Sequence, residues 1–529
     1  MTTRRNLLKS SLSLAAAPVG MSVAIEVAHA EDMPKWNNET GVLVLGYGNA
    51  GSNAAIAAAD AGAKVLILEK TPAGGGNVSV SSGGFVVPTN KEDYYNFQKA
   101  LYELSRSEWD KDLLDLFCEE SLHLGDYVSS LAPEGKIGAY GHAGYQNLPG
   151  ADCVNKMSMR NVPGAKGGDR LFGIFDRAVK ARNIPVLVNC PARRLVRRGN
   201  EVLGVEAVYE GKPYFVKANK AVVICTGGFQ SNPELMARYI YGNPMAYLGS
   251  PAHTGDGLLM AQSMGCDLWH MNSVSAPLGV QVPGVKAGIA MVTRQPAFIW
   301  VDQDGKRFVN EKKLDYHCSW MAVNNFDAIN HRYPRIPCYI MDSSYLKAGP
   351  LISNGGSGWA INREGYKWSK DNQKEIDSGV IIKADTIEEL AKKLGIADPS
   401  VLSATVKRWN SDLREKGIDT EYGRTLTADP NMKAVFVGRD VKSWSAPIEE
   451  GSFYAVKLVP VTYHTMGGPK KSVKAEVLDP FGQPIPRLYV AGELGSTWGL
   501  TYQGACANAD AMVFGRVAGR NAAALENWK

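Results

Sequence analysis

Three glycines and an acidic residue near the start of the chain have the spacing needed to bind a dinucleotide. Gly46, Gly48 and Gly51 follow the apolar run 41–45, and Glu69 directly follows a second apolar run. In this pattern the first glycine makes a tight turn, the second lets the backbone approach a pyrophosphate, and the third lets a helix pack on a strand. The carboxylate of Glu69 is placed to accept hydrogen bonds from ribose hydroxyls.

These residues must be held by a strand, a helix and a second strand. The apolar runs 41–46 and 64–68 predict buried strands, and the small residues of 52–61 predict the helix between them. The N-terminus of that helix offers unpaired N–H groups and a partial positive charge to phosphates. Asn49, Ala50 and Lys70 are also expected to contact the cofactor.

A second glycine-rich segment, 74–84, indicates that the bound dinucleotide is FAD and not NAD. It resembles the GGN-x5-GG segment of the fumarate reductase and 3-ketosteroid dehydrogenase superfamily of flavoproteins. The resemblance implies that this segment runs past the flavin-side pyrophosphate and the ribityl chain of FAD. The residues that carry it are Gly75, Gly76, Asn77, Ser82, Gly83 and Gly84.

Further stretches resemble the same superfamily and occur in its order along the chain. They are 189–192, 221–229, the TGDG turn 254–257 and the AGE strand 488–493. The resemblance implies that Ala192 meets adenine, that Glu493 bonds the ribityl chain, and that a helix beginning at Asn508 and Ala509 points its N-terminus at the flavin. The other expected FAD contacts are Thr226, Gly227, Gly228, Asp256, His464 and Gly492.

The resemblance also implies how FAD is held and how electrons arrive. Members that bind FAD covalently have a histidine where this chain has Asn77, so non-covalent FAD is expected. The eight cysteines form no C-x-x-C pair, so motifs for haem attachment, iron–sulfur clusters and zinc ribbons are absent from the sequence, and no metal site is expected. Electrons must therefore come from another molecule.

The residues at the positions of the family's substrate-binding groups differ from those of fumarate reductases. A carboxylate-binding histidine of that family falls on Tyr463, an arginine falls on or beside Tyr502, and the proton-delivering arginine falls on Asp315. The cationic groups that hold a dicarboxylate are thus replaced. The sequence instead resembles the 3-ketosteroid dehydrogenase branch, whose ketone-binding tyrosine matches Tyr502 and whose catalytic tyrosine lies within one position of Tyr316.

Tyrosine hydroxyls suit chemistry at a C=C bond beside a carbonyl. With a pKa near 10 a phenol is neutral at pH 7 and can donate to a developing enolate or exchange a carbon-bound proton. We expect Tyr502, with a backbone N–H near Gly504, to polarise the carbonyl and Tyr316 to protonate carbon. Tyr463 and Asp315 are further candidates, although all of these could be ordinary structural residues. For His464 a structural hydrogen bond rivals a catalytic role.

The predicted fold is α/β, with a Rossmann-like FAD-binding domain interrupted by an α+β capping domain. The FAD-binding domain is expected at 36–272 and 464–529, and the cap at 273–463. Within the cap, 383–394 and 399–416 alternate apolar and charged residues at helical spacing.

Residues 1–30 resemble a twin-arginine export signal, with Arg4 and Arg5 before an apolar stretch and an A-x-A cleavage site at 28–30. The expected location is therefore the periplasm, with export of the folded protein. With 45% apolar residues and a net charge of +5, the 529-residue chain indicates a globular protein and gives no sign of a nucleic-acid surface. No later stretch is apolar enough to span a membrane.

Several functions remain open from the sequence. The first is a reductase or dehydrogenase of an enone or unsaturated acid, with a c-type cytochrome or quinol as electron partner. Another is a fumarate-type reductase whose clamp uses re-sited arginines such as Arg294 or Arg307. A third is an electron-transfer flavoprotein subunit, and a nicotinamide dehydrogenase is the weakest alternative.

Overall fold

The first predicted strand is part of a central β-sheet of the protein. The computed structural model describes residues 33–528 except 163–166, 243–244, 292–294, 333–334, 353–365 and 429–442, so the predicted export signal and Arg294 lie outside the described residues. The strand order is β22-β23-β9-β1-β2-β6, with β8 and then β7 added beside β9. The strands are β1 (Asn38–Leu45), β2 (Val65–Leu68), β6 (Val186–Leu187), β7 (Ala192–Arg198), β8 (Glu201–Tyr209), β9 (Lys212–Ile224), β22 (Glu476–Leu478) and β23 (Pro484–Val490).

The middle of this sheet is parallel and buried. Strand β1 pairs in parallel with β2 and β9, and β9 pairs in parallel with β23. Residues 42–45 are buried without interruption. A parallel strand covered on both faces needs such a continuous apolar run, which explains the Val-Leu-Val-Leu sequence.

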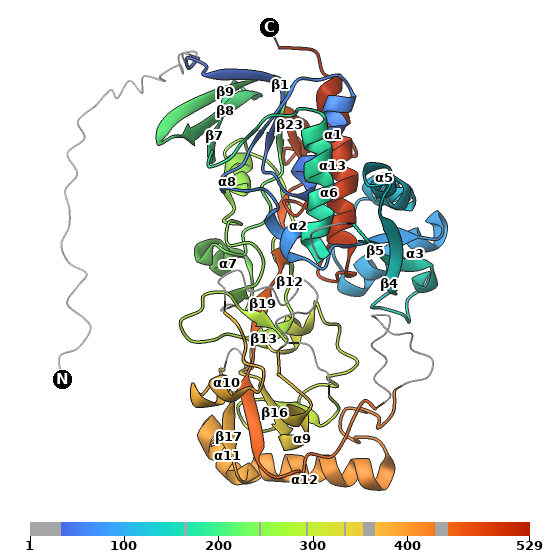
Figure 1. Ribbon diagram of the computed structural model, residues 1–529, viewed down its shortest axis with the longest axis vertical. Coiled ribbons are helices and arrows are strands. Elements are labelled where there is room, and N and C mark those ends of the chain that lie inside the picture. The colour runs from blue at the N-terminus through green and yellow to red at the C-terminus, as the bar shows by residue number, and fades with distance from the viewer. Residues whose placement is uncertain are drawn as a thin grey trace, which may run out of the picture. The chain divides into compact units, whose positions relative to one another are not determined.

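Three helices lie together against this sheet: α1 (Asn49–Asp60), α6 (Gly167–Ala181) and α13 (Cys506–Ala524) (Figure 1). Helices α1 and α13 approach closely because glycines replace side chains at their contact. A Cβ atom on Gly515 would lie 2.6 Å from the carbonyl oxygen of Ala50, and one on Gly519 would lie 2.2 Å from that of Ala54. The small residues of both helices therefore seat the C-terminal helix beside the dinucleotide motif.

A three-stranded antiparallel sheet, β3-β5-β4, lies after the second glycine segment. The pairing of β4 with β5 contains a bulge between Ala139 and Gly141. A bulge changes the direction in which a side chain points, and the residue at this bulge is Tyr140. The elements of this region are α2 (Gly76–Val80), β3 (Gly84–Pro88), α3 (Lys91–Ser105), α4 (Lys111–Leu122), α5 (Leu124–Leu131), β4 (Lys136–Gly141) and β5 (Val154–Arg160).

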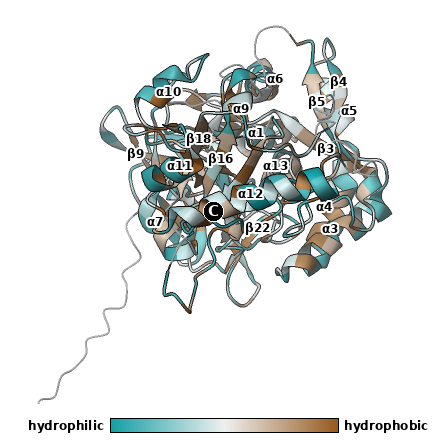
Figure 2. Ribbon diagram, turned by 90° about the horizontal axis from the view of Figure 1, so that it is seen from below, coloured by the Kyte–Doolittle hydropathy of each residue, from teal (hydrophilic) through white to brown (hydrophobic). Residues whose placement is uncertain are grey.

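A separate antiparallel sheet, β15-β16-β18-β17, is drawn wholly from the predicted cap. In Figure 2 helices α11 and α12 are largely hydrophilic, whereas strands β16 and β18 are hydrophobic. The elements are β15 (Phe298–Val301), β16 (Cys338–Asp342), α9 (Ser343–Lys347), α10 (Gln373–Asp377), β17 (Ile382–Ala384), α11 (Ile387–Leu394), α12 (Pro399–Lys416) and β18 (Phe453–Lys457).

Of the two amphipathic segments, 399–416 is a helix over the predicted range. The other is a helix only from Ile387, because residues 382–384 pair with β18 and Thr386 caps the helix by accepting from the N–H of Glu389. Residues 35–529 form one compact unit, so the division at 272 and 463 stays a prediction.

Short strands connect the two sheets. The pairs β12–β20 and β13–β19 bring residues 274–280 beside residues 459–465. These elements are α7 (Pro233–Tyr239), β10 (Ala246–Tyr247), α8 (Asp256–Gln262), β11 (Leu268–Trp269), β12 (Val274–Ser275), β13 (Leu278–Val280), β14 (Ile289–Ala290), β19 (Val459–Thr462), β20 (His464–Thr465) and β21 (Gly468–Pro469). None of the helices in the described part of the chain has the length and apolarity to cross a membrane.

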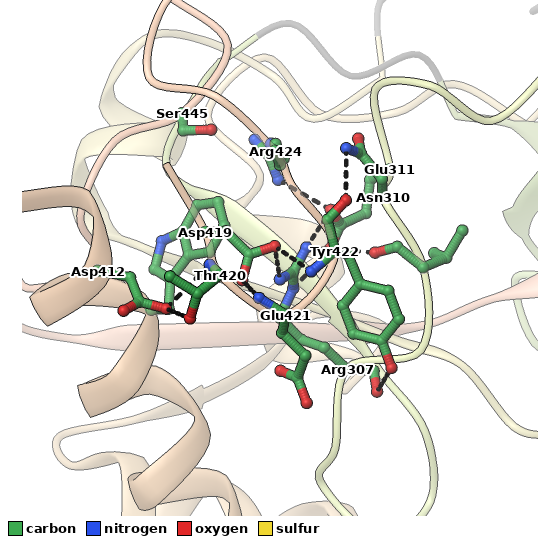
Figure 3. Close-up of polar contacts among 12 residues, drawn as sticks. Arg307, Asn310, Glu311, Asp412, Asp419, Thr420, Glu421, Tyr422, Arg424 and Ser445 are labelled. Carbon is green, nitrogen blue, oxygen red and sulfur yellow. Dashed lines mark hydrogen bonds and ion pairs between the residues drawn. The ribbon is translucent and has the colours of Figure 1, made fainter. Parts of the chain in front are cut away.

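A buried cluster of charged side chains holds the predicted cap together (Figure 3). The Arg307 guanidinium lies 2.8 Å from Glu311 Oε2 and 2.5 Å from Asp419 Oδ2, and Arg424 lies 3.3 Å from Glu311 Oε2. All four side chains are 3% exposed or less. Arg307 is therefore engaged in structural ion pairs, and it is not available as the re-sited substrate clamp considered from the sequence.

Candidate active site

A cavity opens at the carboxyl ends of the parallel strands, where the predicted dinucleotide motif lies. Ligands bind at this edge in open α/β sheets. The predicted cofactor residues that line it are Gly46, Gly48, Asn49, Ala50, Glu69, Lys70, Gly76, Asn77, Ser82, Gly84, Ala192, Thr226, Gly227, Asp256, His464, Gly492, Glu493 and Asn508. Gly51, Gly75, Gly83, Gly228 and Ala509 are not among the residues that line it.

Two glycines of the first motif are needed for backbone packing, and the third leaves space in the cavity. A Cβ on Gly46 would lie 2.4 Å from the carbonyl oxygen of Cys225, and one on Gly51 would lie 1.9 Å from that of Gly46. Gly46 has a φ of +99°, which favours glycine. A Cβ on Gly48 would meet only the carbonyl oxygen of Gly75, at 3.8 Å. Backbone therefore packs on Gly46 and Gly51, whereas Gly48 faces free space in the cavity.

Replacing Gly51 with alanine is expected to weaken FAD binding and stability together. Its methyl group would overlap the turn at Gly46, and overpacking costs about 1–3 kcal/mol. Fluorescence titration of apoprotein with FAD and thermal unfolding measure both effects. In the matched control, Gly173→Ala in α6, the added Cβ meets nothing within 4 Å. That variant should bind FAD normally and gain up to about 1 kcal/mol of helix stability; equal behaviour of the two variants would contradict the packing role of Gly51.

Glu69 and Lys70 are held by neighbouring segments. Glu69 accepts hydrogen bonds from the backbone N–H of Tyr47 at 2.9 Å and of Thr71 at 2.8 Å. The ammonium group of Lys70 lies 2.7 Å from Asp256 Oδ2, which joins the first motif to the predicted TGDG turn. Each carboxylate oxygen can accept more than one hydrogen bond, so Glu69 keeps capacity for ribose hydroxyls.

Asn77 and Glu493 meet although they lie far apart in the sequence. Asn77 donates to both carboxylate oxygens of Glu493, at 2.8 and 2.9 Å, and accepts from the N–H of Ser250 at 2.6 Å. His253 Nδ1 lies 3.1 Å from Glu493 Oε2. Burial alone would raise the pKa of Glu493, but these hydrogen bonds and the nearby histidines lower it. His253 was missed from the sequence, although it directly precedes the TGDG turn.

The C-terminal helix reaches the cavity with its first turn. It begins at Cys506 after Ala505, whose φ is +80°, so the predicted start at Asn508 was two residues late. Asn508 donates to the carbonyl oxygen of Gly84 at 2.8 Å, and Asn49 donates to Asn508 Oδ1 at 3.2 Å. These hydrogen bonds tie the helix N-terminus to both glycine motifs.

Three buried polar atoms of residues on the cavity wall have no partner within the described part of the protein: Thr226 Oγ1, Ser275 Oγ and His464 Nδ1. Buried polar groups are costly unless they are hydrogen-bonded, so a ligand that supplies partners at these points fits this cavity. Burial lowers the pKa of His464, which keeps its ring neutral. Together with the free space at Gly48 and the helix N-termini, these atoms fit the polar groups of FAD.

Two of the predicted tyrosines line the same cavity. Tyr463 and Tyr502 contribute to the wall, whereas Tyr316 lies behind Tyr463, with the two hydroxyl oxygens 3.2 Å apart. The hydroxyl of Tyr502 accepts from the N–H of Ala507 at 3.0 Å. Burial raises the pKa of Tyr463 and Tyr502 well above the ordinary value, so both phenols stay protonated.

Of the two other predicted catalytic residues, Gly504 lines the cavity and Asp315 does not. Gly504 lines the cavity, and a Cβ there would lie 2.5 Å from His317 Cε1, so glycine makes room for this imidazole. Asp315 Oδ1 accepts from the N–H groups of His317 and Cys318 at 3.0 and 3.1 Å, and its side chain is not part of the wall. The structure thus places Asp315 behind the residues that line the cavity, where it supports the turn that carries His317.

The wall residues that sequence reasoning missed include Tyr140, Lys156 and His317. Burial, together with the nearby Lys156, lowers the pKa of His317 to about 3, so this imidazole is neutral at pH 7. Burial lowers the pKa of Lys156 to about 8, against the raising effect of Asp315. Among the described residues, no arginine lines the cavity.

The sheet, the helix N-termini at its carboxyl edge and this cavity define a flavin-nucleotide-binding oxidoreductase fold. Residues 41–508 match the family model described as "FAD binding domain", and the chain belongs to that family. It is a FAD-dependent oxidoreductase, which confirms the predicted superfamily, cofactor and α/β class.

Individual relatives agree with this family. The chain is 30% identical over 508 residues to a "Fumarate reductase (cytochrome)" of Shewanella frigidimarina, covering 91% of this chain and 76% of that protein. A flavocytochrome c3 fumarate reductase in its open conformation has a TM-score of 0.67 and 26% identity, over 97% of this chain and 85% of that one. The 3-ketosteroid delta1-dehydrogenase of Sterolibacterium denitrificans has a TM-score of 0.77 over 92% of this chain and 100% of that one, and at 22% identity it shows the shared fold.

Proposed function

We propose that this oxidoreductase reduces, or in reverse forms, a C=C bond conjugated to a carbonyl group. The observation that carries the proposal is the cavity wall beyond the nucleotide-binding residues, which presents the phenols of Tyr463 and Tyr502 and includes no arginine among the described residues. Neutral donors of this kind suit a carbonyl oxygen that gains charge during the reaction. FAD, when bound, supplies hydride transfer.

Tyr502 is the proposed donor to the carbonyl oxygen. Its oxygen already accepts from the N–H of Ala507, so its own hydrogen is free to point at a substrate. The rings of His317 and His464 meet Tyr502 edge to face, at centroid distances of 5.1 and 5.0 Å. These neighbours restrict the phenol, and a fixed donor needs no reorganisation as charge develops.

Tyr463 and Tyr316 form the proposed proton path to carbon. Tyr463 contributes to the cavity wall, whereas Tyr316 does not, so Tyr463 is the proposed direct donor. Tyr316 is 3.2 Å behind it and can return a proton to Tyr463 after donation. The role expected for Tyr316 from the sequence is thereby divided between two tyrosines, with Tyr463 as the direct donor.

The electron partner and the location belong to the same proposal. With the export signal expected at 1–30, the protein works in the periplasm, and a c-type cytochrome or a quinol supplies its electrons. The relative whose name includes "cytochrome" favours such a partner. A second candidate is a fumarate-type reductase of an unsaturated dicarboxylate, favoured by the 30% identity to that relative.

Turnover of a compound panel with reduced methyl viologen as electron donor tests this function. We expect saturated products from some enones or unsaturated monocarboxylates, and slow turnover of fumarate because arginine clamps are missing from the described wall. Using NADH in place of viologen is the control for donor type and should support little turnover. Rapid fumarate reduction with no other substrate would instead establish the second candidate.

A further inference from the structure

We propose that His253 binds a phosphate group of FAD and that its side chain becomes an imidazolium when the cofactor binds. The inference concerns how FAD is held, and it does not depend on the reaction proposed above. It adds a charged contact that the glycine motifs do not include, and it means that FAD binding takes up a proton.

The Nδ1 side of the His253 ring is occupied within the protein. This nitrogen lies 3.1 Å from Glu493 Oε2, and the two side chains are 9% and 15% exposed. An ionised carboxylate only accepts hydrogen bonds, so Nδ1 carries a hydrogen that it donates to Glu493. The amide nitrogen of Gln230 lies 3.0 Å from Nδ1, and its oxygen Oε1 has no partner among the described residues. A half-turn of that amide lets the oxygen share the same hydrogen.

The other ring nitrogen, Nε2, lies beside glycines of two cofactor motifs. A Cβ on Gly76 would lie 3.4 Å from His253 Nε2 and 3.9 Å from the Cα of Gly48, and all three residues line the cavity. In this motif the second glycine, here Gly48, lets the backbone approach a pyrophosphate. The side-chain contacts of His253 with polar atoms of the described residues are made by Nδ1, so Nε2 is left for a ligand at this place.

Gly227 positions the His253 ring before the cofactor binds. A Cβ on Gly227 would lie 2.4 Å from Cε1 and 2.6 Å from Nε2 of the imidazole, so only glycine leaves room for the ring. The backbone of His253 is held as well, because its N–H donates to the carbonyl oxygen of Ser250 at 3.2 Å and its own carbonyl oxygen accepts from Ser231 at 3.0 Å. A phosphate therefore meets a donor whose place is already set.

The charges on the wall favour a further cation once FAD is bound. The carboxylates on the wall belong to Glu69, Asp256 and Glu493, and the ammonium groups belong to Lys70 and Lys156. The pyrophosphate of FAD adds negative charge to this set, and buried charge is costly unless it is paired. Histidine is the side chain that most readily gains a charge near neutral pH. As an imidazolium it donates through both nitrogens, one to the glutamate and one to a phosphate oxygen.

The titratable neighbours of His253 support this gain of charge. Hydrogen bonds and the nearby histidines lower the pKa of Glu493, so that its carboxylate is ionised and attracts a cation. His464 also interacts electrostatically with His253, but burial lowers the pKa of His464 and keeps that ring neutral. Lys70 and Asp256, which is on the turn after His253, neutralise each other at 2.7 Å.

Release of FAD from the full-length holoprotein at several pH values tests this inference. The fluorescence of free FAD in a dilution series gives the dissociation constant between pH 6 and pH 9. We expect the constant to rise by about tenfold or more from pH 6 to pH 8, because the proton held by the complex becomes scarcer. His253→Gln cannot gain a charge, so its dissociation constant should be higher at pH 6 and nearly independent of pH.

Phosphorus NMR of the bound cofactor shows whether the contact is with the phosphates. The pyrophosphate resonances of the wild-type holoprotein should move with pH over the same range, and those of His253→Gln should not. If His253→Gln retains too little FAD for these measurements, Glu493→Gln replaces it. That variant lacks the carboxylate that favours the imidazolium, so the rise in the dissociation constant should begin at a lower pH.

The matched control is His123→Gln. His123 also lies beside a glutamate, 3.7 Å from Glu119, but its side chain is 63% exposed and is not part of the cavity wall. This variant should keep the wild-type affinity for FAD and its pH dependence.

Three results would overturn the inference. The first is a wild-type dissociation constant that does not change between pH 6 and pH 9, and the second is the same rise with pH in His253→Gln. The third is phosphorus resonances that do not move with pH in the wild type, which would mean that the histidine packs against the cofactor without binding its phosphates. None of these readouts uses a substrate, so they are independent of whether the proposed reaction occurs.

Discussion

Tyr502→Phe is expected to lower kcat/KM by about 10²–10³-fold, the usual effect of removing one donor to a developing oxyanion. The ring, its edge-to-face contacts with His317 and His464, and its burial would remain, because only the hydroxyl is lost. The loss should lie mainly in kcat, because the donor is needed most when charge develops. Steady-state kinetics with the best compound of the panel measures it.

Tyr339→Phe provides the control for removing a buried hydroxyl. The Tyr339 hydroxyl donates to that of Tyr345 at 2.8 Å within the sheet of the predicted cap, away from the cavity wall. This variant should keep wild-type kcat and differ only in stability. Wild-type kinetics for Tyr502→Phe would remove Tyr502 from the mechanism, and an unchanged flavin spectrum in that variant would show that its cofactor is still bound.

Arg307→Ala is expected to destabilise the protein by about 3–5 kcal/mol. The substitution leaves Glu311 and Asp419 as buried carboxylates without their shared guanidinium, and breaking a buried ion pair has this cost. Arg424 would still lie 3.3 Å from Glu311, but its other hydrogen bonds are to the backbone carbonyl oxygens of Phe298, Pro296 and Trp444. Urea unfolding, followed by tryptophan fluorescence, measures the loss.

An exposed arginine gives the comparison for this prediction. Arg332 pairs with Asp304 at 2.7 Å, and their side chains are 37% and 39% exposed. Surface pairs of this kind contribute about 0–1 kcal/mol, so Arg332→Ala should have a small effect. Similar losses for the two variants would mean that burial does not set the strength of the Arg307 cluster.

The cofactor side of the site was predictable because local sequence determines it. Gly51 is required by packing on the backbone of Gly46, a few residues away, and Gly46 is favoured by its own positive φ, and their spacing is visible in the chain. Asn77 and Glu493 were each predicted as cofactor residues from a motif of the superfamily, whereas their hydrogen bond to each other was not predicted. Where a motif marked only the neighbourhood, as at Asn508, the exact helix start was missed because Ala505 makes the turn.

The substrate side was less predictable because it is built from distant segments. Lys156 looks like an ordinary strand residue, and only the pairing of β5 between β3 and β4 shows that it is buried. His317 enters the wall because Gly504, far along the chain, leaves space for it. Tyr316, chosen from a motif position, lies behind Tyr463, since a motif does not specify which of two neighbouring tyrosines lines the cavity.

The most direct test is a single turnover of the anaerobically photoreduced, FAD-loaded protein mixed with an unsaturated carbonyl compound. We predict that the oxidised flavin absorbance returns in one phase, with one equivalent of the saturated product for each flavin. A flavin that stays reduced with every such compound, yet is oxidised by a cytochrome, would contradict the account and identify an electron-transfer subunit instead.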